Sequence, residues 1–376
     1  MNRYIKHIWL KVCCLALVWV IALPVTGQQL LKYDPAGVSY LPIHATEATA
    51  DDLFSSEEVL RFKLQLNYKA LLKDRGDERS YHQATITYKT AQGENVAVPL
   101  KVRVRGRHRR DPNVCRFPPL LLNFPKKAVA KTWFAGTDKI KLVTHCIGDD
   151  YVLREYLVYK LYNIVADRSF RVRLCYIDYE DTENRKDIGG NYAFLIEEEE
   201  RLADRSKSII MAEELLIRMD ATDERTMAKL AMFQFMIGNT DWSVPYRHNI
   251  LLLYSVNNGK PVPVPYDFDY NGIVMPPYAK PPPILDIRSV RQRLFRGYTY
   301  TDDVLAELVP FFNNRREAFY QVYNNPLLDN KYKKQTFKYL DEFYEIINDP
   351  KDFRRYIVKQ GERNEKNSIM IKGLEK

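Results

Sequence analysis

Apolar and polar residues alternate with a period of two along much of the first half of the chain. The alternation is plain at 83–90 and at 95–104, and Gln92-Gly93 between these segments predicts an antiparallel hairpin. The pattern does not decide between helix and strand at 60–73. Further strands are predicted at 120–124, 139–144, 171–179 and 191–196, with an amphipathic helix at 151–165. The first half of the chain is therefore expected to be rich in sheet.

Apolar residues recur at helical spacing in the second half of the chain, and many of them are Phe or Tyr. Helices are predicted at 211–217, 223–237, 301–313, 315–324 and 331–347. Because the aromatic residues keep the helical spacing, we expect them in a core. Gly238 and Asn239 are expected to end the second of these helices, since both residues tolerate the left-handed conformation of a helix exit. This half of the chain is therefore expected to be mainly helical.

Oxygen-bearing side chains gather where the helical pattern is interrupted, at 238–272. Here an apolar strand lies on each side of an Asn-Gly turn. Asn249 and Asp267 lie at nearly equal distances before and after the turn, so folding the chain there brings both to the open end of the hairpin. Asp241 lies in the loop that leads to this end. Such oxygen ligands suit Mg²⁺, which prefers one or two carboxylates together with substrate phosphates, and kinases use this arrangement for phosphoryl transfer.

The stretch around this hairpin resembles the CotH-type kinases, a family named for a spore-coat protein, and more loosely the HipA-type kinases. The residues that carry the resemblance are Gly238-Asn239-Thr240-Asp241, Arg247-His248-Asn249, Gly259-Lys260 and Pro265-Tyr266-Asp267-Phe268-Asp269. Weaker matches at 151–161 and 191–197 extend the resemblance over about 95–275. It implies an α+β, two-lobed protein-kinase-like fold, with a sheet-rich N-lobe at 60–197 and a helical C-lobe at 198–376.

The resemblance also implies a site at the junction of the two lobes, with ATP and Mg²⁺ as cofactors. Asp241 would act as the catalytic base that takes the proton of an acceptor hydroxyl. Asn249 and Asp267 would hold Mg²⁺, and Asp269 is a candidate for a second metal ligand. The plain alternative is that Asn239, Asp241 and Asn249 are turn formers, as Asn and Asp often are.

The nucleotide side of such a site needs a strand lysine that holds the phosphates and pairs with a glutamate on a helix. Lys141 is the first candidate and Lys139 the second, because alternation places both on one face of a strand, and Glu155 is the candidate partner. The family commonly has a lysine in the segment that corresponds to 120–124, where this chain has Asn123. The identity of the nucleotide lysine therefore stays open, and a solvated lysine and a surface glutamate are the alternatives.

Two charged segments are candidates for the same site. The turn at 103–110 is densely basic and is expected to face phosphate, with Gly106 and Arg107 as contacts, or else to be a charged edge that discourages strand pairing. Nucleic acid is not expected as a partner, because no aromatic residues interleave with these arginines. Glu197 is a candidate near the adenine, at the hinge between the lobes. The basic stretch 288–296 is a further segment that could reach the phosphates.

The beginning of the chain predicts export. Arg3, Lys6 and Lys11 precede an apolar run that is too short for a comfortable membrane span, and small residues follow it. We therefore expect a secretory signal peptide at 1–27, with 28–59 leading into the fold. The mature protein is expected to be a monomer without a membrane span, in the periplasm, at the cell surface or secreted.

Charge and cysteines narrow the picture only slightly. Loss of the signal peptide lowers the net charge from +9 to about +6, which fits solubility and phosphate-bearing partners equally well. The mature chain keeps Cys115, Cys146 and Cys175, an odd set that is no disulfide framework. One pair could still form in an oxidising compartment. No spacing of Cys or His indicates zinc.

Three functions are compatible with these patterns. The leading one is transfer of the γ-phosphate of ATP to a protein or a small-molecule acceptor. The others are a kinase-like pseudoenzyme that binds without catalysis and a surface structural or interaction protein. The intact set of Asp241, Asn249 and Asp267 argues against a decayed site, because drift would break at least one of them.

Overall fold

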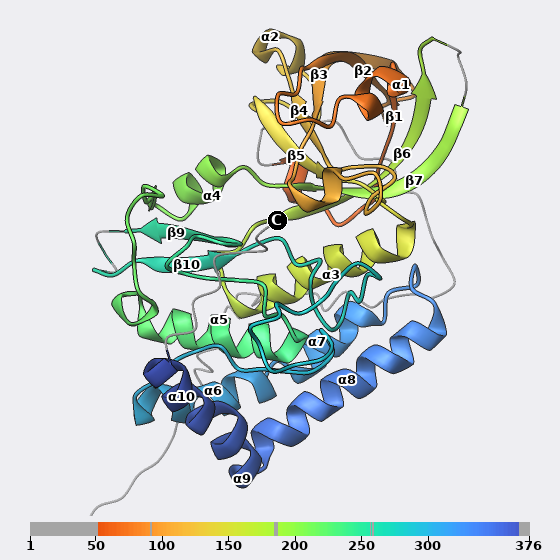
Figure 1. Cartoon of the computed structure of the whole chain (residues 1–376). Coiled ribbons are helices and arrows are strands. Elements are labelled where there is room, and N and C mark those ends of the chain that lie inside the picture. The colour runs from red at the N-terminus through yellow and green to blue at the C-terminus, as the bar shows by residue number, and fades with distance from the viewer. Residues whose placement is uncertain (1–51, 91, 184–186, 256, 258, 368–376) are drawn as a thin grey trace, which may run out of the picture. The chain divides into compact units, whose positions relative to one another are not determined.

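The computed structural model describes residues 52–90, 92–183, 187–255, 257 and 259–367. The predicted signal peptide and most of the lead-in lie outside the described residues, as do two positions of the central hairpin turn. All described residues belong to one compact unit. Their architecture is mixed α+β, with a sheet-rich first region and a helical second region (Figure 1). The lobe boundary after residue 197 stays a prediction.

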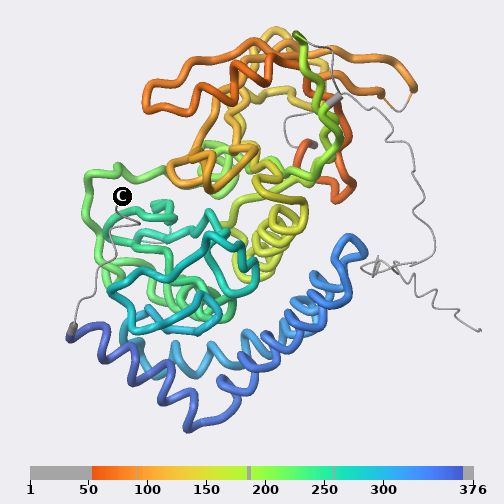
Figure 2. The backbone as a smooth tube through the Cα atoms, turned by 45° about the vertical axis from the view of Figure 1, so that its right-hand side comes forward, coloured from red at the N-terminus to blue at the C-terminus, as the bar shows by residue number. Residues whose placement is uncertain are grey.

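Seven strands close into a barrel in the first region, in the order β1-β2-β3-β4-β5-β7-β6 (Figures 1 and 2). They are β1 Leu60–Leu66, β2 His82–Lys89, β3 Asn95–Val104, β4 Leu120–Asn123, β5 Lys139–Val143, β6 Val172–Asp181 and β7 Asp187–Ile196. The predicted hairpin is confirmed as β2 and β3, in which Ile86 faces Val98. The alternation does not predict the closure, because closure depends on β1, which pairs antiparallel with β2 and parallel with β6.

Two strands of the barrel, β6 and β7, contribute to two cores because successive side chains point to opposite faces of a sheet. Cys175 and Ala193 lie in the core that fills the barrel. Leu174 and Phe194, each one position away, pack in the core of the helical region. The barrel and the helices are thus joined by strands that belong to both cores.

Helices make up most of the second region. The helices of the described chain are α1 Tyr68–Lys73, α2 Lys126–Val129, α3 Asp149–Val165, α4 Glu199–Arg205, α5 Glu224–Ile237, α6 Asp302–Asn313, α7 Arg316–Tyr323, α8 Asn330–Asn348, α9 Pro350–Phe353 and α10 Lys359–Asn367. α3 is deeply buried, because it packs against β6 and β7 and also against α5 and α7 (Figure 1). None of the helices in the described ranges is both long enough and apolar enough to cross a membrane.

A three-stranded sheet in the order β10-β9-β8 carries the central hairpin. Its strands are β8 Ile209–Ile210, β9 Ile250–Tyr254 and β10 Val262–Pro265. The predicted pairing of the hairpin is confirmed, with Leu251 opposite Val264. The helix predicted at 211–217 is wrong. Met211 donates its backbone N–H to the carbonyl of Leu252 at 3.0 Å, so this apolar segment continues the edge of the sheet before it turns away.

The helix that leads into the hairpin loop, α5, begins and ends with residues suited to those positions. Asp223 caps its start by accepting the N–H of Thr226 at 2.9 Å. Gly238 ends it in the left-handed conformation, with φ +69°. A side chain at this position would also come within 3.0 Å of the carbonyl oxygen of Val290. Glycine is therefore required both by the backbone conformation and by the space available.

Candidate active site

Asp241 lies in a short loop that closes on itself. Ser243 and His248 exchange backbone hydrogen bonds of 2.9 and 3.0 Å, which places the imidazole beside the carboxylate. His248 Nε2 lies 2.7 Å from Asp241 Oδ1, and Asn249 Nδ2 donates to Asp241 Oδ2 at 3.2 Å. Asn239 Oδ1 accepts the backbone N–H of Asp241 at 2.8 Å. The carboxylate is therefore oriented by residues of its own loop.

An arginine holds the backbone on both sides of Asp241. Arg296 Nη1 donates to the carbonyl of Thr240 at 2.6 Å and to that of Trp242 at 2.5 Å. Burial lowers the pKa of Arg296 to about 10, and the charge of Asp241 opposes this shift. Arg296, the last arginine of the basic stretch 288–296, thus binds carbonyl groups of the protein. Its role here is to fix the loop.

The open end of the hairpin brings Asn249 and Asp267 together, as the sequence predicts. Tyr266 donates its backbone N–H to the carbonyl of Asn249 at 3.0 Å, so Asp267 directly follows the last pair. Asn249 and Asp267 take left-handed conformations, with φ +54° and +59°. Tyr159 of α3 accepts the backbone N–H of Asp267 at 2.9 Å through its hydroxyl oxygen. Left-handed conformations at residues other than glycine cost free energy and cluster at functional sites.

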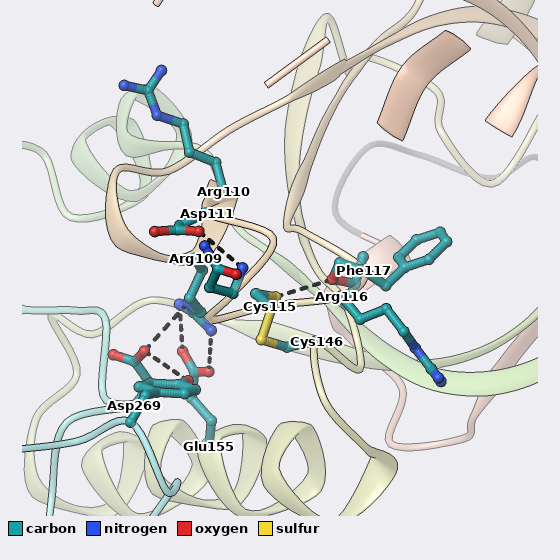
Figure 3. The surroundings of a disulfide bond; sticks show 12 residues. Arg109, Arg110, Asp111, Cys115, Arg116, Phe117, Cys146, Glu155 and Asp269 are labelled. Carbon is teal, nitrogen blue, oxygen red and sulfur yellow. Dashed lines mark hydrogen bonds and ion pairs between the residues drawn. A yellow bond between two sulfur atoms is a disulfide. The ribbon is translucent and has the colours of Figure 1, made fainter. Parts of the chain in front are cut away.

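Arg109 joins the hairpin to α3 and to the barrel, and Figure 3 shows its side chain directed at Glu155 and Asp269. It lies in a single turn of helix after β3, His108–Arg110. Its Nη1 lies 2.7 Å from Glu155 Oε2 and its Nη2 3.3 Å from Oε1. Nη2 also lies 2.6 Å from Asp267 Oδ1, and Nε lies 3.3 Å from Asp269 Oδ2. One buried guanidinium thus faces three carboxylates.

The pKa values of two of these carboxylates, Glu155 and Asp269, are raised, mainly by burial. Burial raises the pKa of Glu155, and Arg109 offsets this only in part. Burial also raises the pKa of Asp269 well above its ordinary value, and the charges of Asp267 and Asp241 add to the effect. Burial by itself would lower the pKa of Arg109, but the three carboxylates raise it well above the ordinary value. Arg105 is a second arginine whose charge acts on Glu155 and Asp267. Burial still disfavours the charged forms of Glu155 and Asp269, and a further cation would stabilise those forms.

The predicted pair of Lys141 with Glu155 does not form. Lys141 Nζ lies 2.5 Å from Glu199 Oε1 at the start of α4, whereas Glu155 holds Arg109. Lys139 is on the same strand and is exposed. Alternation predicts the strand positions of these lysines, but it does not say which helix lies opposite a strand. The partner of Glu155 is an arginine from a turn and not a lysine from a strand.

Glu197 is wholly buried and binds other parts of the chain. Its Oε1 accepts Arg205 Nε at 2.8 Å, and its Oε2 accepts the backbone N–H of Arg171 at 3.0 Å. Both oxygens are engaged inside the protein, so its carboxylate is not placed to contact an adenine as expected. Gly106, with φ +91°, and Arg107 lie exposed in the basic turn. That turn reaches the site through another of its arginines.

A disulfide braces the turn that carries Arg109 (Figure 3). Cys115 and Cys146 are bonded across a sequence separation of 31, which joins the segment after Arg109 to the segment before α3. Phe117 donates its N–H to the carbonyl of Cys146 at 3.1 Å, which adds a backbone bond at the same point. Cys175 is the free cysteine of the described chain, and burial raises its pKa to about 12. The pairing that the sequence leaves open is thus between Cys115 and Cys146.

The residues at the hairpin end fit a Mg²⁺ ion that also binds phosphate. Asp267 is the most open of the carboxylates around Arg109, with 39% of its side chain exposed. Asn249 directs its Nδ2 to Asp241, so Oδ1 is the atom of the amide that could bind a metal. Asp269 is less open, with 8% of its side chain exposed and its Oδ2 accepting the hydroxyl of Tyr278 at 3.0 Å. In the described ranges no group of three or more His, Cys, Asp or Glu side chains is arranged to hold a metal, but Mg²⁺ beside phosphates needs only one or two carboxylates.

Three residues of the site are missing from the sequence-based candidates. Arg109 is one of several arginines in a basic turn, and composition does not tell which of them points inward. Tyr159 reads from its helical spacing as a surface residue, whereas the structure buries it. His248 reads from the sequence as a structural loop residue. Its place between Arg247 and Asn249, within the motif of the resemblance, is the signal that could have found it.

Comparison with known proteins leaves the chain without an assigned family. No family model matches it, and no curated protein matches it. Among solved structures, the crystal structure of a Helicobacter pylori proinflammatory kinase, CtkA, is similar at 12% identity and a TM-score of 0.32, over 77% of this chain and 95% of that chain. A likeness this weak carries no argument. The resemblance to CotH-type kinases rests on the residues quoted for it, and the function has to be argued from the site.

Proposed function

We propose that this protein is an ATP-dependent phosphotransferase with a protein-kinase-like fold, which passes the γ-phosphate of ATP to a protein or small-molecule acceptor. The observation that carries the proposal is the convergence of Asp241, Asn249 and Asp267 at one end of the hairpin. The left-handed backbone at Asn249 and Asp267 supports it, because strain of this kind persists where a function requires it. A base, an amide ligand and a carboxylate ligand are the groups that phosphoryl transfer needs.

In the proposed reaction Asp241 is the base. The acceptor oxygen forms a bond to the γ-phosphorus while the bond from that phosphorus to the β–γ bridging oxygen breaks. ADP leaves with the electron pair of the broken bond, and the proton of the acceptor passes to a carboxylate oxygen of Asp241. His248 and Asn249 keep this carboxylate in one orientation through their contacts of 2.7 and 3.2 Å.

Asn249 and Asp267 are the proposed holders of Mg²⁺. The bound ion would neutralise charge on the phosphate oxygens. The raised pKa values of Glu155 and Asp269 support this assignment, because a divalent cation beside these buried carboxylates would stabilise their charged forms. Asp269 remains a candidate second ligand, although its oxygen is already engaged with Tyr278.

We further propose that the reaction takes place outside the cytoplasm, in the periplasm, at the cell surface or in the medium. The signal-peptide pattern at 1–27 supports this location. The disulfide between Cys115 and Cys146 supports it independently, because disulfides persist in oxidising compartments. The proposed partners are ATP and a hydroxyl-bearing acceptor, and the protein is proposed to act as a monomer.

A kinase-like protein that binds nucleotide without catalysis is the second candidate. The specific observation in its favour is the contact of 2.6 Å between Arg109 Nη2 and Asp267 Oδ1, since a guanidinium there competes with a metal for this carboxylate. The two candidates share the nucleotide site. They differ in whether phosphate is transferred.

The test is transfer of labelled γ-phosphate from Mg·ATP by the purified protein, alone and with a casein-like acceptor. The wild-type protein is expected to label itself or the acceptor, and Asp267→Asn is expected to give background labelling only. Asp303→Asn, at the exposed start of α6, is the matched control and should transfer like the wild type. Binding of Mg·ATP without transfer would favour the second candidate. Absence of both binding and transfer would refute a nucleotide function.

A further inference from the structure

The position of Arg109 is unusual for a residue with only a structural role. Its three guanidinium nitrogens each lie within 3.3 Å of a carboxylate oxygen, and these oxygens belong to Glu155 on α3 and to Asp267 and Asp269 beyond the hairpin. Only 9% of the side chain is exposed. The arginine itself comes from the barrel. A single side chain therefore connects the turn after β3, α3 and the end of the hairpin.

We propose that Arg109 is the phosphate-binding cation of this site, and that the divalent cation arriving with the nucleotide displaces it from Asp267. This inference rests on the proposed function. A guanidinium has five N–H donors in a planar fork, which matches carboxylate and phosphate equally well. Glu155 keeps the fork in place from one side. The Nη2 group that leaves Asp267 is then free to donate to a phosphate oxygen.

The contact between Arg109 and Asp267 can be given up without loss of the surrounding structure. The backbone of Asp267 is held by the Tyr159 hydroxyl at 2.9 Å and by the end of the hairpin, independently of Arg109. Arg109 in turn keeps two buried partners, Glu155 and Asp269, when the third is lost. Asp267 is also the most exposed of the three carboxylates and the one accessible to an incoming metal.

The strand lysines do not compete for this role. Lys141 is paired with Glu199 at 2.5 Å, and Lys139 is exposed on the same strand. Glu155 forms an ion pair with Arg109, at 2.7 Å. The pairing of a strand lysine with a helix glutamate is thus replaced here by the pairing of a turn arginine with the same kind of glutamate.

The proposal predicts opposite effects of Arg109→Met on two ligands. The variant should bind Mn²⁺ alone more tightly than the wild type, roughly tenfold, because the competing cation is gone while the carboxylates remain. It should bind the magnesium complex of a non-hydrolysable ATP analogue roughly tenfold or more weakly, because a charged hydrogen bond to phosphate is lost. A purely structural arginine would weaken both ligands or neither.

The experiment is calorimetric titration of the purified wild type, Arg109→Met, Arg109→Lys and Lys141→Met with Mn²⁺ and with the magnesium complex of the analogue. Arg109→Lys keeps a charge but loses the fork, so its Mn²⁺ affinity should stay near that of the wild type while its analogue affinity falls several-fold. It also serves as the test if Arg109→Met does not fold, as judged by circular dichroism. Lys141→Met should behave like the wild type.

The outcomes separate this inference from the proposed function. If the wild type binds the analogue and both Arg109 variants bind it equally well, the role of Arg109 is refuted while the nucleotide site stands. Weaker Mn²⁺ binding by Arg109→Met would also refute the displacement. If the folded wild type does not bind the analogue at all, the proposed function itself fails, and the inference fails with it.

Discussion

The two halves of the site are held in place by very different parts of the chain. The Asp241 carboxylate is oriented by residues of its own loop, the most distant of them, Asn249, eight positions away, and the backbone beside it is held by Arg296. Asp267 is contacted by Arg109, 158 positions away, and by Tyr159, 108 positions away. The carboxylate of the Asp241 half is therefore oriented locally, with one distant arginine bracing the backbone of its loop. The Asp267 half exists only when the barrel, α3 and the hairpin are assembled.

The halves also differ in charge. The donors on the Asp241 carboxylate are an amide and an imidazole, at 3.2 and 2.7 Å. Two arginines act on the carboxylates of the Asp267 half, Arg109 through ion pairs and Arg105 through its nearby charge, yet burial still raises the pKa of Glu155 and of Asp269. A cationic ligand therefore gains most at the Asp267 half. The difference suggests a division of work, with chemistry on the acceptor at one half and binding of the charged nucleotide at the other.

The largest expected effect comes from changes that separate these two tasks. In Asp241→Asn the base is lost, so transfer should fall by at least about a hundredfold while the affinity for the magnesium complex of the ATP analogue stays within about twofold of the wild type. In Asp267→Asn both should fall, because a metal ligand is lost. Steady-state transfer and calorimetric titration on the same preparations measure the two quantities. Loss of analogue affinity in Asp241→Asn equal to that in Asp267→Asn would remove the distinction between the halves.

The same difference explains what the sequence could predict of the site. The hairpin register follows from the spacing of Asn249 and Asp267 around a turn, and the loop with Asp241 adjoins it, so this geometry is encoded within about thirty residues. The contact of Arg109 with Glu155 depends on how a barrel turn meets a helix. No period in the sequence encodes that meeting.

The fold also has parts that the sequence predicts and parts that it does not. Strands and helices with clear periods, such as β2, β3, α5 and α8, are predicted close to their observed bounds. The closure of the barrel depends on β1, whose pattern is ambiguous and whose partner β6 lies more than a hundred positions further along the chain. Apolar residues at 211–217 suit a helix by composition, yet Met211 bonds to the edge of β9 and the segment then turns away, because the neighbouring sheet offers a hydrogen bond that the pattern does not reveal.

Removal of the disulfide between Cys115 and Cys146 should have an effect of intermediate size, confined to the Asp267 half of the site. Replacing Cys115 and Cys146 by Ser opens a link across a separation of 31 residues and should lower the free energy of unfolding by about 3 kcal/mol. The turn that carries Arg109 loses its brace, so analogue affinity should fall as well. Urea unfolding and calorimetric titration of the double variant measure both effects. Cys175→Ala is the matched control, since this buried cysteine forms no disulfide. Unchanged analogue affinity in the double variant would show that the disulfide does not affect the nucleotide site.

The smallest expected effect is a pH dependence in the same braced segment. His145 is stacked on Phe117, with ring centroids 4.7 Å apart, and burial together with the nearby charge of Arg116 lowers its pKa to about 4. The unfolded chain binds the proton more tightly than the folded one, so this histidine lowers stability as the pH falls from about 6.5 towards 4. Between pH 7 and pH 5 the loss should be about 2 kcal/mol.

The variant His145→Phe keeps an aromatic ring against Phe117 and cannot take up the proton. Urea unfolding at pH 7 and pH 5 should therefore show a drop in stability for the wild type that is smaller by about 2 kcal/mol in the variant. Glu155 and Asp269, whose raised pKa values favour the folded state at lower pH, are present in both proteins and cancel in this difference. Equal pH dependence in the two proteins would mean that His145 is solvated. In that case the segment joined to Arg109 through the disulfide would be looser than the Asp241 loop, and the contrast between the two halves would sharpen further.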